Sequence, residues 1–246
     1  MIHAVISDIH SNYEAFSEVL NFLGSKSVSS YLICGDIIGY GPQPIECIKA
    51  VRELGDKAKI VLGNHDAVLA GKMDIKWFND YARKSIEITK ERIDKDTVEW
   101  FCALPEKIDL GKILIVHGSP KSPLKEYLLS EIQYSDNLEN LKSEIVFFGH
   151  THIPMCFCKD ENGKNMGDFI KPFARIKIND KGKFFINPGS VGQPRDGNSM
   201  ASFGLFDDEK MVFELIRIDY DVKKVQKLMK EINMPQLLIE RLDMGY

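Results

Sequence analysis

The sequence has few cysteines, no surplus of positive charge and no long apolar run. Five cysteines, an odd number, are scattered over 246 residues, which is typical of free thiols in a reducing compartment. Aspartate and glutamate (36) outnumber lysine and arginine (32), so no basic excess exists to neutralise nucleic-acid phosphates or anionic lipids. No apolar stretch approaches the roughly 20 residues that span a bilayer. Asp8 and His10 interrupt the first short apolar stretch, so the start of the sequence is not typical of a signal peptide. We therefore expect a cytoplasmic protein without stable nucleic-acid binding or membrane association.

Glycine-rich nucleotide loops, internal repeats and flexible linkers are absent as well. Neither G-x-x-x-x-G-K nor G-x-G-x-x-G occurs, so a backbone loop that cradles nucleotide phosphates is not indicated. No Ser-, Gly- or Pro-rich stretch divides the chain. Residues 1–246 are therefore expected to form one domain.

Short β-branched strands alternate with amphipathic helices in the first part of the chain. Asn12 is the expected N-cap of a helix that is closed by Gly24, and Pro44 is expected to open a helix that is closed by Gly55. Strands are predicted at residues 2–6, 31–34 and 59–62. This alternation indicates a parallel βαβ arrangement, hence an α/β fold.

The rest of the chain has a different pattern. Residues 67–105 predict two or three helices without a strand, which we interpret as a helical insertion over a site. From Met155 onward, turn signals at Asn162-Gly163 and Asp180-Lys181-Gly182 predict antiparallel hairpins. Further strands are predicted at 113–116 and 145–148, and a helical stretch at 221–243.

Five of the six histidines lie in short polar clusters that follow predicted strands. The carboxyl ends of parallel strands share one edge of an open sheet, so groups that are distant in sequence converge there. Aspartate, asparagine and histidine at such an edge form a mixed oxygen and nitrogen ligand set for divalent metals. The clusters are Asp8-Ile9-His10, Gly35-Asp36, Gly63-Asn64-His65-Asp66, His117-Gly118 and Gly149-His150-Thr151-His152.

Seven of these side chains are candidate metal ligands. In an extended chain residues i and i+2 point the same way, so Asp8 and His10 can reach into one site, as can His150 and His152. Asp36 is the expected bridge, because its two carboxylate oxygens can each take one cation. The ligands carry a summed charge of about −2, so two divalent cations would leave the centre attractive to a phosphate ester. The seven candidates are Asp8, His10, Asp36, Asn64, His117, His150 and His152.

The order of these clusters resembles the calcineurin-like metallophosphoesterase superfamily. Its signature is D-x-H, G-D-x-x, G-N-H-[DE], H and G-H-x-H, and all five elements occur in order within residues 8–152. The stretch 187–195 (NPGSVGQPR) is similar to small archaeal and bacterial members of the phosphodiesterase branch. The resemblance implies a four-layer α/β/β/α sandwich of two mixed sheets, with the active site at one edge and the helical insertion above it.

The resemblance also implies a ligand set and a mechanism. One metal would be held by Asp8, His10, Asp36 and His152, and the other by Asp36, Asn64, His117 and His150. A metal-bridging hydroxide would attack phosphorus in line, with His65 as acid or hydrogen-bond donor at the leaving oxygen. We expect Mn²⁺ to support activity in vitro, while Fe, Zn²⁺, Ni²⁺ and Co²⁺ suit the same donors. The resemblance alone implies a homodimer.

One departure from the superfamily bears on the substrate. In protein Ser/Thr phosphatases the second motif is extended to G-D-x-x-D-R-G, and its arginine binds the phosphate. Here residues 35–41 read GDIIGYG, without the second Asp and the Arg. We therefore predict a phosphodiesterase acting on a small phosphoester. The alternatives are a phosphomonoesterase, a dinucleoside-polyphosphate hydrolase and, from another class, a non-catalytic protein-binding scaffold of the same fold, which the retention of every ligand and His65 disfavours.

Three further side chains have two interpretations each. Arg195 lies in a Gly- and Pro-rich loop, where it either contacts phosphate or forms a salt bridge that fixes the loop. Tyr40 either lines the substrate cleft or packs against neighbours. Asp66 either orients His65 or caps the helix that follows it.

Overall fold

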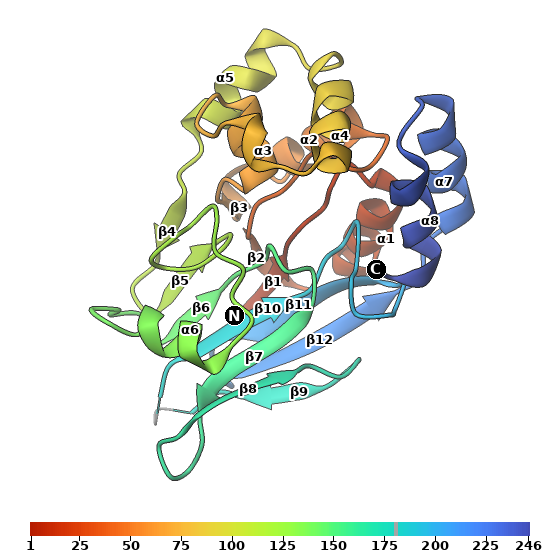
Figure 1. Ribbon diagram of the computed structural model, residues 1–246. Coiled ribbons are helices and arrows are strands. Elements are labelled where there is room, and N and C mark those ends of the chain that lie inside the picture. Colours follow the sequence, from red (N-terminus) through yellow and green to blue (C-terminus); the bar gives the residue numbers. More distant parts are fainter. Residues whose placement is uncertain (180–181) are drawn as a thin grey trace.

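Two mixed sheets form the centre of the computed structural model, which describes residues 1–179 and 182–246 (Figure 1). Sheet A has the strand order β3 (Ala58–Ile60), β2 (Val28–Ile33), β1 (Ile2–Ile6), β11 (Ala201–Asp207), β12 (Val212–Ile218), β9 (Arg175–Lys177). Sheet B has the order β4 (Lys107–Asp109), β5 (Ile113–Val116), β6 (Ile145–Phe147), β10 (Phe184–Pro188), β7 (Pro154–Lys159), β8 (Asn165–Phe169). Strands β1, β2 and β3 are parallel, as are β5, β6 and β10, so each sheet brings several carboxyl ends to one edge.

Successive side chains of a strand point to opposite faces of its sheet, and this determines which residues lie between the sheets and which lie under the helices. On β1, Ala4 packs toward the helices while Val5 packs toward sheet B, because successive residues point to opposite faces. On β5, Ile115 joins the same core between the sheets, and Leu114 joins the outer core that contains Tyr134. Helices α1 (Tyr13–Gly24) and α2 (Pro44–Glu53) cover sheet A, and α6 (Glu131–Asn137) covers sheet B. The predicted four-layer α/β/β/α sandwich is confirmed.

The predicted helix starts in the first βαβ units are confirmed. The Asn12 side chain accepts a hydrogen bond from the backbone N–H of Ala15 (3.1 Å), and Pro44 is the first residue of α2. Gly24, however, is the last residue of α1 rather than the residue after it. Gly55 follows α2 in a left-handed conformation (φ +56°) and opens the short 3₁₀ helix η1 (Gly55–Lys57).

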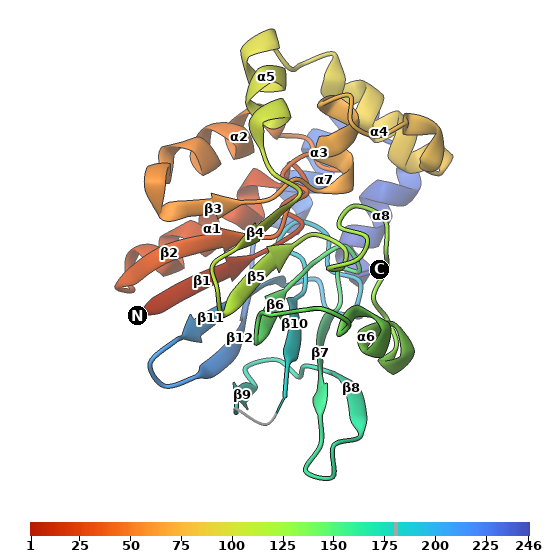
Figure 2. The ribbon, with the colours of Figure 1, turned by 90° about the vertical axis from the view of Figure 1, so that its left-hand side faces the viewer.

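The helical insertion lies above the ends of the parallel strands (Figures 1 and 2). It contains the 3₁₀ helix η2 (Ile75–Trp77), α4 (Asp80–Lys90) and α5 (Lys95–Ala103), and is preceded by α3 (Asn64–Leu69). Helix α4 packs against the C-terminal helices α7 (Val222–Glu231) and α8 (Gln236–Met244), with Ile86, Met229 and Leu238 in one core. The stretch 221–243 is thus two helices, because Pro235 precedes α8 and cannot continue α7.

The two predicted hairpins have different outcomes. Strands β7 and β8 form an antiparallel hairpin around Asn162-Gly163, as expected. Asp180 and Lys181 lie outside the described residues, but the strands on either side of them do not pair with each other. Strand β9 joins β12 in sheet A and β10 joins β6 and β7 in sheet B, so these two strands do not form the expected second hairpin. We retain the single-domain assignment of residues 1–246 as a proposal.

Among the described residues, no helix is both long and apolar enough to cross a membrane.

Candidate metal centre

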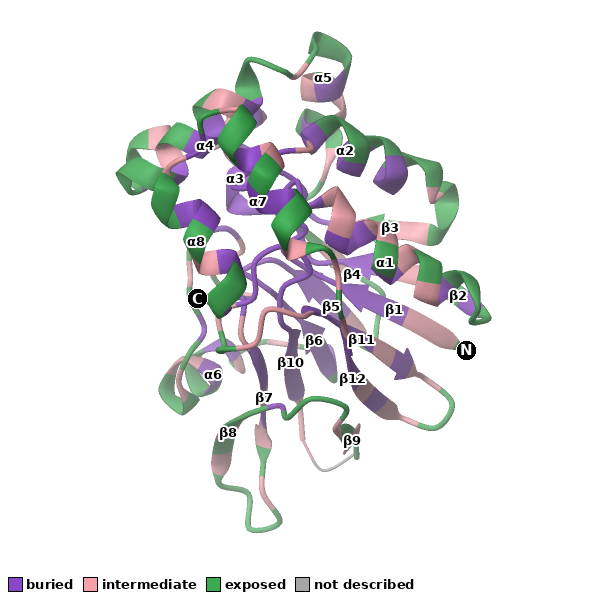
Figure 3. Ribbon diagram, turned by 90° about the vertical axis from the view of Figure 1, so that its right-hand side faces the viewer, coloured by how far each residue is buried: buried purple, intermediate pink, exposed green. Residues whose placement is uncertain are grey.

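The five polar clusters converge on one buried region between the strand ends and the insertion (purple loops in Figure 3). Each of the seven candidate ligands, and His65 with them, is at most 2% exposed. Asp8 and His10 follow β1, Asp36 follows β2, and Asn64 opens α3. His117 follows β5, and His150 and His152 follow β6. Groups from both sheets therefore meet at one edge, as the sequence predicts.

The first donor cluster joins Asp8, His10 and His152. The Nε2 atoms of His10 and His152 are 3.0 Å apart, and His152 Nε2 is 3.3 Å from Asp8 Oδ1. The Oδ2 atom of Asp36 completes the cluster, 3.5 Å from His10 Nε2. Asp8 Oδ1 is buried and has no hydrogen-bond partner in the described structure.

The second donor cluster is centred on His117. Its Nε2 atom is 2.9 Å from Asn64 Oδ1 and 3.0 Å from His150 Nδ1. The same nitrogen is 3.4 Å from Asp36 Oδ2. His150 therefore faces the second cluster and His152 the first, which is the division that the resemblance implies.

Asp36 links the clusters through one oxygen rather than two. Its Oδ2 atom faces both His10 and His117, while Oδ1 accepts the backbone N–H of His65 (2.9 Å). The first turn of α3 points an unpaired N–H at Oδ1, so Oδ2 is the oxygen that faces both donor clusters. The expectation that each oxygen takes one cation stays a prediction.

The donors fit divalent cations. His10 Nδ1 donates to Ile38 O (2.9 Å) and His152 Nδ1 donates to Gln193 O (2.6 Å), so both Nε2 atoms present lone pairs. Two lone pairs facing each other at 3.0 Å repel unless a cation lies beside them. Two ligand atoms that each lie about 2.1 Å from one metal ion, at an angle between a right angle and the tetrahedral angle, are roughly 3.0–3.4 Å from each other. The observed spacings are of that size.

The second cluster has the same construction. His117 Nδ1 donates to Cys34 O (2.8 Å), so Nε2 is the ring atom that faces Asn64 Oδ1, His150 Nδ1 and Asp36 Oδ2. These carbonyl partners orient the rings as they do in known metal sites.

Burial sets the protonation of the histidine ligands. Desolvation lowers the pKa of His10, His150 and His152 well below the usual value, so all three are neutral and can bind metal. Burial also lowers the pKa of His117, but the charge and hydrogen bond of Asp36, together with the charge of Asp8 and the Cys34 carbonyl, outweigh it and raise that pKa to about 9. Without a metal, a proton on His117 thus compensates the buried carboxylate.

The ligand backbone is held in a rarely populated conformation. Five of the seven candidate ligands have positive φ angles, between +48° and +68°: Asp8, His10, Asp36, His150 and His152. The argument from an extended chain is therefore wrong for both D-x-H and H-x-H. Side chains reach the centre because sharp left-handed turns aim them there, at a cost of about 1–2 kcal/mol per residue. Backbone hydrogen bonds from Asp8 to Gly35 (3.1 Å) and from His10 to Asp36 (3.0 Å) stabilise these turns.

Asp66 caps the local backbone and does not orient His65. Its carboxylate accepts the N–H groups of Gly63 (3.1 Å), Ile37 (3.1 Å) and Ile38 (3.2 Å). Among the described contacts none joins it to the His65 ring. Asp66 therefore ties the start of α3 to the loop that carries Asp36.

His65 lies beside the donors with an unused ring nitrogen. Its ring is packed against those of Tyr40 (centroids 4.5 Å apart), Phe78 (4.8 Å) and His10 (4.9 Å). The Nδ1 atom is buried and has no partner in the described structure. Burial lowers the pKa of His65 to about 4, so the ring is neutral near pH 7. Its position suits a hydrogen-bond donor at the rim of the centre.

Arg195 and Tyr40 lie together at the first cluster. The guanidinium is 5.6 Å from the centre of the Tyr40 ring, and that ring meets the His10 ring edge-on at 4.6 Å. Arg195 donates to Gln193 Oε1 (3.0 Å), while its Nε has no partner and no described carboxylate pairs with it. The neighbouring Asp196 pairs instead with Arg217. The salt-bridge interpretation of Arg195 is therefore wrong.

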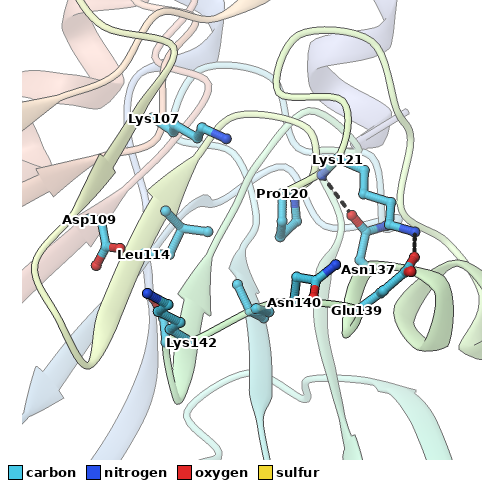
Figure 4. Close-up of a pocket in the computed structure, with 11 residues that line it drawn as sticks. Lys107, Asp109, Leu114, Pro120, Lys121, Asn137, Glu139, Asn140 and Lys142 are labelled. Atoms are coloured by element: carbon cyan, nitrogen blue, oxygen red, sulfur yellow. Dashed lines mark hydrogen bonds and ion pairs between the residues drawn. The ribbon is translucent and has the colours of Figure 1, made fainter.

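Two cavities lie near this part of the fold. One of about 400 Å³ adjoins the first cluster through Arg195 and is also lined by Ile153, Phe169 and Lys171. Another of about 470 Å³ lies outside sheet B, beside β4, β5 and the end of α6 (Figure 4). It contains none of the candidate site residues, and one side is closed by the Lys121–Glu139 ion pair (2.8 Å).

Two aromatic residues near the centre are not predicted from the sequence. Tyr127 stacks on the His150 ring with centroids 3.7 Å apart, and Trp77 lies 6.2 Å from the same ring. Trp77 ends the three-residue helix η2 and Tyr127 lies in a loop, and neither segment is long enough or regular enough for a periodicity to mark a face. Only the spatial arrangement identifies them.

Two adjoining donor clusters at the carboxyl edge of a two-sheet sandwich define a class of metal-dependent hydrolases. Residues 1–211 match the model of the calcineurin-like phosphoesterase superfamily domain, and the chain belongs to that superfamily. It is thus a hydrolase of phosphoesters in a family that uses divalent metals.

Similar proteins agree with this assignment. An uncharacterized protein of Methanocaldococcus jannaschii is 38% identical over 98% of this chain and 97% of its own length. The crystal structure of a metallophosphoesterase from Sphaerobacter thermophilus superimposes with a TM-score of 0.89, at 31% identity over all of both chains. A symmetrical bis(5′-nucleosyl)-tetraphosphatase of Buchnera aphidicola is 34% identical over 48% of this chain, but this match spans only 44% of that protein.

Proposed function

We propose that the chain is a phosphodiesterase that uses two divalent cations, one at each donor cluster. The position of Asp36 Oδ2 is the main support, since it lies 3.5 Å from His10 Nε2 and 3.4 Å from His117 Nε2. An oxygen shared in this way suits the separation of about 3.5–4 Å that is usual in two-metal hydrolases. Mn²⁺ is the ion we propose for activity in vitro, and Fe, Zn²⁺, Ni²⁺ and Co²⁺ suit the same donors.

When bound, the two cations supply charge neutralisation at phosphorus and a water of lowered pKa for in-line displacement. Three side chains of the protein bind the substrate, position the binding group and assist the leaving oxygen. Arg195, with its unpartnered Nε, binds a phosphoryl oxygen beside the first cluster. Tyr40 holds the guanidinium in place through its ring face. His65 donates a hydrogen bond to the leaving oxygen, and such a donor typically contributes about 10²–10⁴-fold in rate.

Two features favour a diester over a phosphoprotein or a simple monoester. The cavity beside Arg195 leaves room for a second ester substituent. The loop after β2 also has Gly39 and Tyr40 where the phosphoprotein phosphatases place their Asp-Arg pair, and the Asp side chain cannot replace Gly39 because the His65 ring fills that space.

A dinucleoside-polyphosphate hydrolase is the second candidate, because the relative from Buchnera aphidicola has that activity in its name. Hydrolysis of bis-p-nitrophenyl phosphate, p-nitrophenyl phosphate and diadenosine tetraphosphate by the Mn²⁺-loaded protein separates the candidates. We expect the highest kcat/KM for the diester, its loss on chelation and its return with Mn²⁺. A higher kcat/KM for p-nitrophenyl phosphate or for diadenosine tetraphosphate would overturn the diester assignment. If metal binds and no ester is cleaved, the protein is a binding scaffold.

Four further assignments rest on the sequence and remain proposals: a small phosphoester substrate, no stable nucleic-acid binding, a cytoplasmic location and a homodimer. Gel filtration with light scattering tests the last of these.

A further inference from the structure

An exposed aromatic pair adjoins the second donor cluster. Trp77, the last residue of η2, is 41% exposed, and Tyr127, in the loop between β5 and α6, is 40% exposed. Their ring planes are within 8° of parallel, with centroids 6.4 Å apart. The two segments are distant in sequence and belong to different layers, so the folded chain places these rings side by side.

The pair is connected to the metal centre on two sides. Tyr127 lies face-on against the His150 ring (centroids 3.7 Å apart, planes at 27°). Trp77 meets Phe78 edge-on at 5.4 Å, and Phe78 in turn contacts the His65 ring at 4.8 Å. A group stacked on these rings therefore adjoins His150 of the second cluster, and Phe78 separates Trp77 from His65.

Packing alone does not explain these rings. Large aromatic side chains stabilise a fold by being buried, and Phe78 beside them is only 6% exposed. The rings present flat apolar surface with polar edges and no charge, which suits another planar ring. Aromatic side chains bind nucleobases in this way, with little dependence on which base is present.

We propose that Trp77 and Tyr127 form a stacking site for the aromatic base of a nucleotide phosphoester whose phosphate lies at the donor clusters. The placement of the phosphate rests on the proposed function, whereas the stacking site rests on the two rings. The substrate class is therefore a nucleoside-bearing ester, not an aliphatic one.

Two esters that differ only in the base test the proposal. Adenosine 5′-methylphosphate and ribose 5-methylphosphate share the two scissile P–O bonds, and release of methanol or of methyl phosphate reports hydrolysis of either ester. We expect the wild-type, Mn²⁺-loaded protein to prefer the adenosine ester by roughly 5- to 150-fold in kcat/KM, the range of one stacked base. Trp77→Ala and Tyr127→Ala should bring that ratio toward one, while Tyr127→Phe should keep most of it.

Tryptophan fluorescence gives a readout that is independent of turnover. The chain has two tryptophans, and Trp100 lies in α5, where it packs on Phe101 at 4.9 Å and lies under Arg52. Trp100→Phe leaves Trp77 as the only reporter and should retain full activity. The adenosine ester should quench it saturably, the ribose ester should not, and Trp77→Phe, which keeps Trp100, should show no quenching.

The outcomes separate this proposal from the proposed function. Quenching of Trp77 by the adenosine ester without hydrolysis of any ester would refute the enzyme and keep the stacking site. Hydrolysis of both esters at equal kcat/KM, or a ratio that both alanine variants leave unchanged, would refute the stacking site and keep the enzyme. Equal quenching of Trp77 by the ribose ester would also refute the stacking site.

Discussion

A methyl group added at Gly39 would displace the His65 ring, whose atoms are the nearest to it. A Cβ atom at Gly39 would lie 2.4 Å from His65 Nδ1, whereas ordinary contacts begin at 3.4 Å, so the ring must move by 3.4 − 2.4 = 1.0 Å. It cannot move freely, because Tyr40, Phe78 and His10 surround it. Misplacing a catalytic group by about 1 Å costs on the order of 10²-fold in rate. Gly39→Ala should therefore lower kcat about 100-fold while metal content is unchanged.

A second glycine provides the matched control. Gly39 also has a left-handed backbone (φ +94°), so alanine there adds a strain of about 1–2 kcal/mol that has no connection with His65. Gly111 has φ +83° and nothing within 4 Å of its would-be Cβ, so Gly111→Ala carries the strain alone. Thermal unfolding should show a loss of stability in both variants, larger in Gly39→Ala because of the added overlap with the His65 ring. Steady-state kinetics with bis-p-nitrophenyl phosphate should show a defect only in Gly39→Ala. Equal activity of the two variants would refute the role of His65.

The remaining predictions concern three side chains around the centre. His65→Ala should keep its metal and lose about 10²–10⁴-fold in kcat, and loss of metal in that variant would show that His65 is a ligand instead. Arg195→Met should raise KM for the diester with little change in metal content; an unchanged KM would remove Arg195 from the substrate site. Asp66→Ala leaves three buried N–H groups without an acceptor and should lower the free energy of unfolding by about 3 kcal/mol or more, measured by urea denaturation. A loss below about 1 kcal/mol would contradict the capping role.

The convergence of the ligands could be predicted because it follows from chain direction alone. An apolar strand followed at once by Asp8, Asp36 or His117 places that side chain at the shared edge of a parallel sheet. The two sheets were likewise implied by the strand pattern and by the family resemblance. These features depend on local sequence and on rules of topology.

The details of the centre could not be predicted because they depend on tertiary contacts. The backbone N–H that occupies Asp36 Oδ1 comes from His65, and its direction is set only when α3 forms. A positive φ angle is normally predicted from a glycine, and the residues that have it here include His10 and His152. Helix α6 was not anticipated, although Ser130 caps it by accepting the N–H of Gln133 (3.3 Å).

The number of metal ions per chain tests the central claim most directly. After loading with Mn²⁺ and removal of free metal, elemental analysis should find two ions in the wild-type protein. Asp8→Asn alters only the first cluster and should retain one, whereas Asp36→Asn removes the charge shared by both clusters and should retain less than one. A wild-type protein that binds a single ion, or an Asp36→Asn variant that keeps two, would contradict a centre built around one shared carboxylate oxygen.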